Sequence, residues 1–201
     1  MIELLRKTEN YQTLVALLKD GKKLPWLRGL ANASTAYLLA TLIDDFPNKS
    51  FLIILPSQRE AEQVLEEICT YTAYPALEAT QILDGQSKMN LFPIWHRKIF
   101  DGIAPPKEIV ADRIRCLEHL LYKERSIIVT SSQAMLYRLP PRQRFAEACC
   151  VLNLGDEIDP DEVAAMLIRG GYQNVELVEV KGEFARRGDI LDVYPLSLIH
   201  I

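Results

Sequence analysis

The chain has 201 residues, which is enough for one complete domain and part of a second. It is 49% hydrophobic and 25% charged, as in ordinary globular proteins, and its formal net charge is −4. This balance argues against a protein that is basic throughout and built to cover nucleic acid, although a local basic patch stays open. The apolar runs are shorter than the roughly 20 residues of a membrane span, and residues 1–10 lack a signal-peptide core, so no membrane partner is expected.

The cysteines argue against a metal site. There are four, and none forms a Cys-x-x-Cys pair, while only three histidines could assist them. Adjacent cysteines at 149 and 150 lie in an apolar run, where we expect buried thiols. Reduced cysteines are typical of a cytoplasmic protein, which is the expected location.

The first elements in chain order are helical. Residues 3–19 show leucines at helical spacing, Pro25 and Gly29 then break the chain, and residues 34–46 are rich in Ala and Leu. The apolar run Phe51–Leu55 stops at a proline, which is typical of a buried strand in a parallel sheet.

The chain then alternates between helices and strands up to residue 130. Ser57 and Glu60 have the spacing of a capping box and open the clearest helix. A weaker strand is expected at 79–83, an irregular loop at 93–106, then a helix, and a second buried strand at 126–130. Such alternation predicts right-handed crossovers and therefore an α/β domain with a parallel sheet.

The pattern changes after two prolines at 140 and 141. A strand is expected at 148–154, and Asp159 then caps a helix that the glycine pair at 170 and 171 ends. Three closely spaced strands follow, at 175–181, 184–187 and 190–194, with glycine turns between them. We expect an antiparallel meander, and with it a second, α+β domain that begins near residue 142.

A phosphate loop would lie around Gly29, between an expected strand and the next helix. Counted from Gly29 in the pattern Gly-x-x-x-x-Gly-Lys-Ser/Thr, the second glycine position is Ser34, the lysine position is Thr35 and the hydroxyl position is Ala36. The groups that would bind the nucleotide phosphates and Mg²⁺ are therefore absent. Either this is an ordinary loop before a helix, or it is a vestigial site that keeps the geometry without the chemistry.

No arrangement of catalytic side chains stands out. His96 and His119 are far apart in sequence, and neither has a Gly-x-Ser-x-Gly motif beside it. The most unusual segment is instead a tight turn in which Arg186 and Arg187 precede a glycine and an aspartate. It could be a solvated hairpin tip or a recognition point, since arginine is over-represented among the residues that dominate interfaces.

Several segments carry a family resemblance. A Gly-Tyr pair at 171–172, the stretch Glu-Phe-Ala-Arg-Arg-Gly at 183–188 and the stretch Ile-Leu-Asp-Val-Tyr-Pro at 190–195 resemble a motif shared by two bacterial repair families. These are UvrB, the helicase subunit of the excision nuclease, and the transcription-repair coupling factors (Mfd).

Two features favour the coupling factors. Their phosphate loop is degenerate, as it is here, whereas that of UvrB is intact. The segment Phe-Pro-Ile-Trp at 92–95, with Phe100, Asp101 and the stretch Arg-Ile-Arg-Cys-Leu at 113–117, is also similar to a coupling-factor segment. Phe100 departs from it, because the family usually has tyrosine there.

The resemblance implies a RecA-like α/β domain with a degenerate phosphate loop over residues 1–141. Part of a small α+β domain, like the second domain of UvrB, would cover residues 142–195, and a tail at 196–201 does not match. Coupling factors release RNA polymerase stalled at DNA lesions and recruit UvrA, and this segment would be the UvrA-recruiting module. The alternative is a UvrB-like, ATP-dependent helicase subunit.

The same resemblance assigns residues and cofactors. An arginine at the position of Arg187 contacts UvrA in the family, and the neighbouring Arg186 and Phe184 are further candidates for partner binding. No catalytic residue and no cofactor is expected in this segment. ATP and Mg²⁺ would belong to a motor located elsewhere in the longer protein, as would the contacts with RNA polymerase and DNA.

Overall fold

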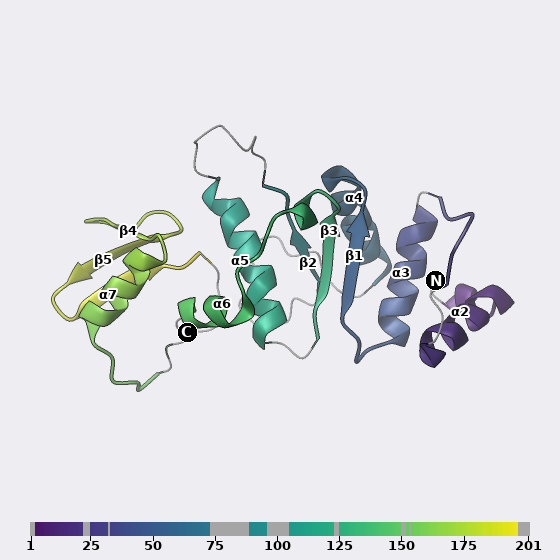
Figure 1. Cartoon of the computed structure of the whole chain (residues 1–201), viewed down its shortest axis with the longest axis horizontal. Helices are drawn as coiled ribbons and strands as arrows, with labels where there is room; N and C mark the ends of the chain where they lie inside the picture. The colour runs from purple at the N-terminus through teal and green to yellow at the C-terminus, as the bar shows by residue number, and fades with distance from the viewer. Residues whose placement is uncertain are drawn as a thin grey trace.

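The computed structural model describes residues 3–21, 25–31, 33–72, 89–95, 105–122, 125–149, 152 and 154–196. Two short helices lie at one end, a parallel sheet with helices on both faces lies in the middle, and a small second sheet lies at the other end (Figure 1). The expected α/β unit followed by a small α+β unit is confirmed.

The central sheet is parallel, as expected. Its strands are β1 (Phe51–Leu55), β2 (Met89–Phe92) and β3 (Ile127–Ser131), in the order β1-β3-β2. In the register, Ile53 pairs with Val129, and Leu91 pairs with the same residue from the other side. The weak strand expected at 79–83 lies outside the described residues, and β2 is a strand that the sequence did not reveal.

Helices pack on both faces of this sheet, but Leu52 and Ile54 of β1 are exposed, so the expectation of a fully buried strand at Phe51–Leu55 was wrong for one of its faces. The helices α3 (Ala33–Asp45) and α4 (Gln58–Tyr71) pack on one face, and α5 (Lys107–Tyr122) packs on the other. Alternate side chains of β3 supply the two cores, because Ile127 and Val129 belong to the first and Ile128 to the second. The expected capping box of α4 is confirmed, since the Ser57 hydroxyl accepts from the Glu60 amide and the Glu60 carboxylate accepts from the Ser57 amide.

The N-terminal segment forms two helices instead of the one expected. These are α1 (Glu3–Arg6) and α2 (Glu9–Asp20), which are separated because Thr8 adopts an extended conformation and caps α2. Tyr11 and Leu14 of α2 pack against Leu38 and Leu42 of α3. None of the described helices is long and apolar enough to cross a membrane.

The C-terminal part contains the 3-10 helix η1 (Ala134–Leu136), the helices α6 (Arg142–Ala148) and α7 (Pro160–Arg169), and the second sheet. Its strands β4 (Gln173–Asn174), β5 (Glu183–Arg187) and β6 (Ile190–Tyr194) lie in that order. The pair β5–β6 is antiparallel, but β4 runs parallel to β5, so the expectation of a purely antiparallel meander was wrong.

Two other expected strands also differ. The strand expected at 148–154 begins where α6 ends, at Ala148, and residues 150, 151 and 153 lie outside the described part. The strand expected at 175–181 is a loop, which we call the 175–182 loop. Only two residues of β4 pair with β5 before the chain turns away, and the carboxylate of Glu183 then accepts hydrogen bonds from two amides of this loop.

Candidate functional site

The segment around Gly29 does not have the form of a phosphate loop. Gly29 has a φ of 79°, in the left-handed region, but residues 25–28 are irregular where a strand was expected. The Ser34 hydroxyl donates to the carbonyl of Ala31 (2.7 Å) and accepts from its amide (2.9 Å). The polar group nearest the helix start is therefore engaged by the preceding turn.

The hydroxyl position of the phosphate-loop pattern faces the protein core. Ala36 has no exposed surface and packs in the same cluster as Ala40, Ile43 and Ile53. Thr35, at the lysine position, is half-buried in the first turn of α3. A magnesium-binding hydroxyl must reach solvent and the nucleotide, so the orientation of residue 36 differs from what that chemistry requires.

The carboxyl end of β2 is held by a buried arginine. The guanidinium of Arg113, on α5, lies 3.9 Å from the ring centre of Phe92 and 4.4 Å from that of Trp95. Its Nη1 donates to the carbonyl of Pro93 (2.6 Å), and burial lowers the pKa of Arg113. Two parts of the segment that resembles the coupling factors thus meet in space, as a packing cluster.

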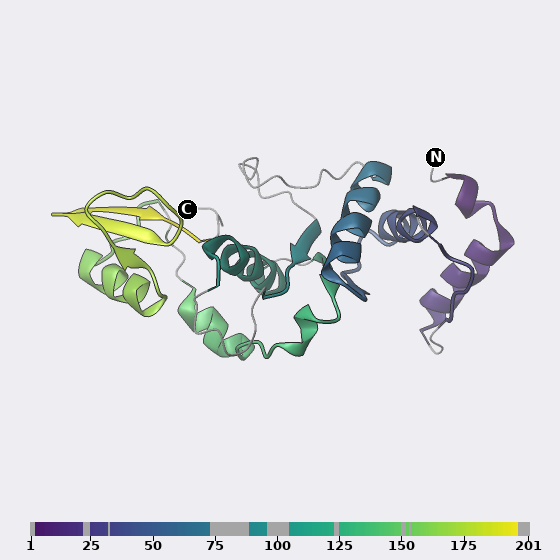
Figure 2. The ribbon, with the colours of Figure 1, turned by 90° about the horizontal axis from the view of Figure 1, so that it is seen from above.

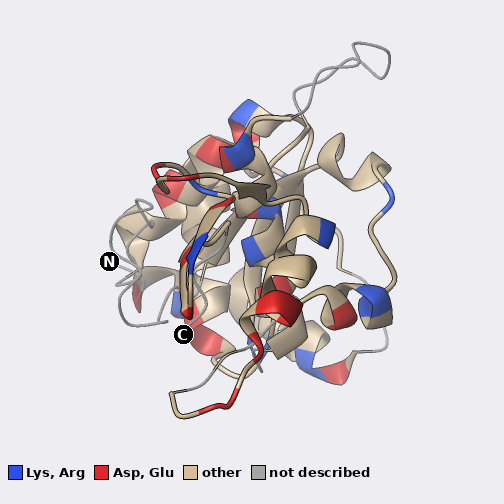
Figure 3. Ribbon diagram, turned by 90° about the vertical axis from the view of Figure 1, so that its left-hand side faces the viewer, with Lys and Arg blue, Asp and Glu red and all other residues tan. Residues whose placement is uncertain are grey.

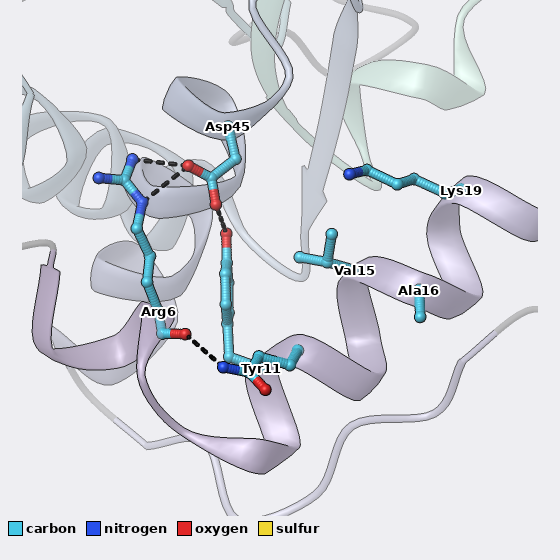
Figure 4. A pocket seen from close by; sticks show the side chains of 7 residues that line it. Arg6, Tyr11, Val15, Ala16, Lys19 and Asp45 are labelled. Atoms are coloured by element: carbon cyan, nitrogen blue, oxygen red, sulfur yellow. Dashed lines mark hydrogen bonds and ion pairs between the residues drawn. The ribbon is translucent and has the colours of Figure 1, made fainter.

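A shallow pocket of about 380 Å³ lies where α2 meets the end of α3 (Figure 4). Arg6 forms ion pairs with Asp44 and Asp45, and the Tyr11 hydroxyl donates to Asp45 (2.6 Å). Burial and the hydrogen bond to Asp45 raise the pKa of Tyr11, which keeps the phenol protonated. These polar groups satisfy one another, so their evident role is to attach α2 to α3.

The two adjacent arginines of β5 point to opposite faces of the second sheet. Arg186 faces α7, where it forms an ion pair with Asp161, and its Nε also donates to the carbonyl of Gly188 (3.1 Å). Arg187 lies on the other face, where its Nη2 is 3.6 Å from a carboxylate oxygen of Asp192 and donates to the carbonyl of Glu176 (3.4 Å). The side chain of Arg187 is 59% exposed.

The structure therefore separates the three residues named as partner-binding candidates. Phe184 is fully buried, on the same face of β5 as Arg186, and is therefore not accessible to a partner. Arg186 is engaged by α7, and Arg187 is the most accessible of the three. In the ribbon seen from the end of the molecule that carries this sheet, acidic and basic positions are interspersed along the described chain (Figure 3).

Comparisons with known proteins show which families this chain is similar to. Residues 150–200 match the family model of the UvrB interaction domain, a range that includes most of residues 196–201. The transcription-repair-coupling factor of Bacillus subtilis is 24% identical over 193 residues, which is 96% of this chain and 15% of that protein. The coupling factor of Haemophilus influenzae is 30% identical over 140 residues, or 69% of this chain and 12% of that protein.

UvrABC system protein B of Thermosipho africanus is also similar, at 24% identity over 188 residues, which is 93% of this chain and 28% of that protein. The chain thus spans 12–15% of the length of these two coupling factors. The resemblance inferred from the sequence motifs is confirmed, and it covers almost the whole chain.

Proposed function

We propose that this relative of the transcription-repair-coupling factors is a recruiting segment, which binds UvrA through its second sheet. The observation that carries the proposal is the position of Arg187, exposed on a strand inside the region that matches the UvrB interaction domain. The family resemblance leads us to expect an arginine that contacts UvrA at this position. An exposed guanidinium with weakly held partners is well suited to a carboxylate on another protein.

The proposal assigns no ATP chemistry to this segment. Ala36 is in the core, Thr35 replaces the phosphate-binding lysine, and residues 25–28 are irregular. ATP, Mg²⁺ and the contacts with RNA polymerase and DNA would belong to other parts of a longer protein, which would release the stalled polymerase. We place the boundary between the two units of this segment at residues 141–142, because the first sheet ends at Ser131 and the second begins at Gln173.

Binding of UvrA to the immobilised chain tests the proposal. We expect saturable binding by the wild-type chain and a loss of roughly tenfold or more in affinity for Arg187→Ala. The control is Arg144→Ala, because Arg144 is exposed on α6, away from the second sheet. Equal binding by wild type and Arg187→Ala would refute the assignment of the site, and absence of wild-type binding would refute the recruiting function.

The second candidate is an ATP-dependent subunit like UvrB, which the similarity to UvrABC system protein B favours. It predicts that the chain binds nucleotide. We expect titration with a fluorescent ATP analogue and Mg²⁺ to give no saturable signal. A saturable signal that unlabelled ATP displaces would support the UvrB-like function instead.

A further inference from the structure

One face of the second sheet is not covered by a helix. Side chains alternate between the faces of a strand, and directly opposed residues of paired strands lie on the same face. The β5–β6 register therefore places six side chains on the face away from α7: Glu183, Ala185, Arg187, Ile190, Asp192 and Tyr194. Seen from above, α7 lies on one side of the sheet and the 175–182 loop lies on the other (Figure 2).

The 175–182 loop is tied to this face at two points. The carboxylate of Glu183 accepts hydrogen bonds from the amides of Glu179 (2.9 Å) and Val180 (3.0 Å). At the other end of the strand, Arg187 donates to the carbonyl of Glu176 (3.4 Å). Between these points Ala185 is only 1% exposed. The loop is therefore held in one place by side chains of β5.

Exposed apolar side chains lie toward both ends of this surface. On the loop, Leu177 is 64% exposed and Val180 is also exposed. On β6, Ile190 is 64% exposed opposite Arg187, and Tyr194 is exposed at the other end, opposite Glu183. Burying such side chains contributes about 1.5–3 kcal/mol each when they are fully covered. Their presence on one face with Arg187 is therefore a reason to expect a covering surface.

We infer that Leu177, Val180, Ile190 and Tyr194 form a docking platform for the protein partner that Arg187 contacts, and that Glu183 positions the loop half of it. The inference rests on the proposed function and extends it from one arginine to a surface. The partner would offer apolar side chains, a carboxylate for Arg187 and basic groups for the acidic side chains of this face.

The charges around the platform decide the class of partner. Glu176 and Glu179 of the loop and Asp192 in the middle of β6 are exposed, and they repel the phosphates of a nucleic acid. The same groups attract lysine or arginine side chains of a protein partner, while the exposed apolar side chains and Arg187 match the anchors typical of protein interfaces. The occupant is thus a folded protein surface, which under the proposed function is that of UvrA.

Substitution of the exposed apolar side chains near Arg187 tests the platform. We expect the double variant Leu177→Ser, Ile190→Ser to weaken UvrA binding roughly tenfold or more, with Arg187 intact. The matched control is Ile168→Ser, because Ile168 is 58% exposed on α7, on the opposite side of the sheet. Circular dichroism and thermal unfolding of each variant show whether the fold is retained.

The outcomes separate the two proposals. If Arg187→Ala abolishes binding and a folded double variant binds like wild type, the platform is refuted and the recruiting function stands. If wild type does not bind UvrA, both are refuted. Weak binding by the double variant with normal binding by Ile168→Ser supports the platform.

The positioning role of Glu183 has its own measurement. Glu183→Gln removes the negative charge while keeping one oxygen that can accept a hydrogen bond. We expect hydrogen exchange of the Glu179 and Val180 amides to become several-fold faster, with UvrA binding weakened and exchange in β3 unchanged. Unchanged exchange at these two amides would refute the positioning role, whatever the binding result.

Discussion

Replacing Arg113 with alanine should destabilise the first domain more than any comparable arginine substitution. The guanidinium donates to the carbonyl of Pro93 at 2.6 Å, and a hydrogen bond from a charged group contributes about 1.5–3 kcal/mol. It also lies against the rings of Phe92 and Trp95, and cation–π contacts removed from water contribute about 2 kcal/mol. We therefore expect Arg113→Ala to lower the free energy of unfolding by about 3–5 kcal/mol.

Urea unfolding followed by tryptophan fluorescence measures this loss. The chain has two tryptophans, and Trp26 is highly exposed, so a Trp26→Phe background leaves Trp95 as the reporter beside Arg113. With a urea dependence of about 2 kcal/mol per molar, the midpoint should fall by about 1.5–2.5 M.

Two further variants make the test specific. Arg113→Lys keeps the charge but loses the planar group between the rings, so we expect an intermediate loss. Arg144→Ala removes an exposed arginine and should change the free energy of unfolding by less than about 0.5 kcal/mol. If Arg113→Ala matches Arg144→Ala in stability and Trp95 emission is unchanged, the energetic role given to this cluster is wrong.

Three more predictions follow from the geometry. Ala36→Thr, even combined with Thr35→Lys, should not create binding of a fluorescent ATP analogue, because residue 36 is in a packed core. Thermal unfolding should show that the free energy of unfolding falls by about 1–3 kcal/mol. Asp45→Ala removes the acceptor shared by α1 and α2, so hydrogen exchange in α2 should accelerate while that in β3 stays slow. Hydrogen bonds from the amides of Glu179 and Val180, together with the nearby charge of Lys107, hold the pKa of Glu183 below its usual value. The 175–182 loop should therefore be ordered above about pH 4.3 and released as the pH falls through the lowered pKa. The shifts of the Glu179 and Val180 amides in NMR spectra would follow this change, and Glu183→Gln should lose the part of it that comes from release of these two hydrogen bonds.

Local sequence patterns were sufficient for the elements that they specify directly. The Ser57–Glu60 spacing located the start of α4, and the continuous apolar run of Phe51–Leu55 located a strand buried on one face. The absence of lysine and hydroxyl at residues 35 and 36 was also visible in the sequence, because a missing group needs no geometry to be recognised.

Elements that depend on distant partners were not visible in this way. The strand β2 has an asparagine in its middle and no clear alternation, and it is a strand because β3 lies beside it. The 175–182 loop contains three valines and a leucine, which favour a strand, yet hydrogen bonds to Glu183 and Arg187 hold it as a loop.

The candidate site shows the same division. Reading the chain identified the arginine turn and its likeness to a repair family, since both rest on residue order. Only the fold decided that Phe184 lies in the core, that Arg186 is held by Asp161 and that Arg187 faces solvent. The physical reason is that a strand alternates its side chains between two faces, and the packing of α7 on one of them determines which face is left for a partner.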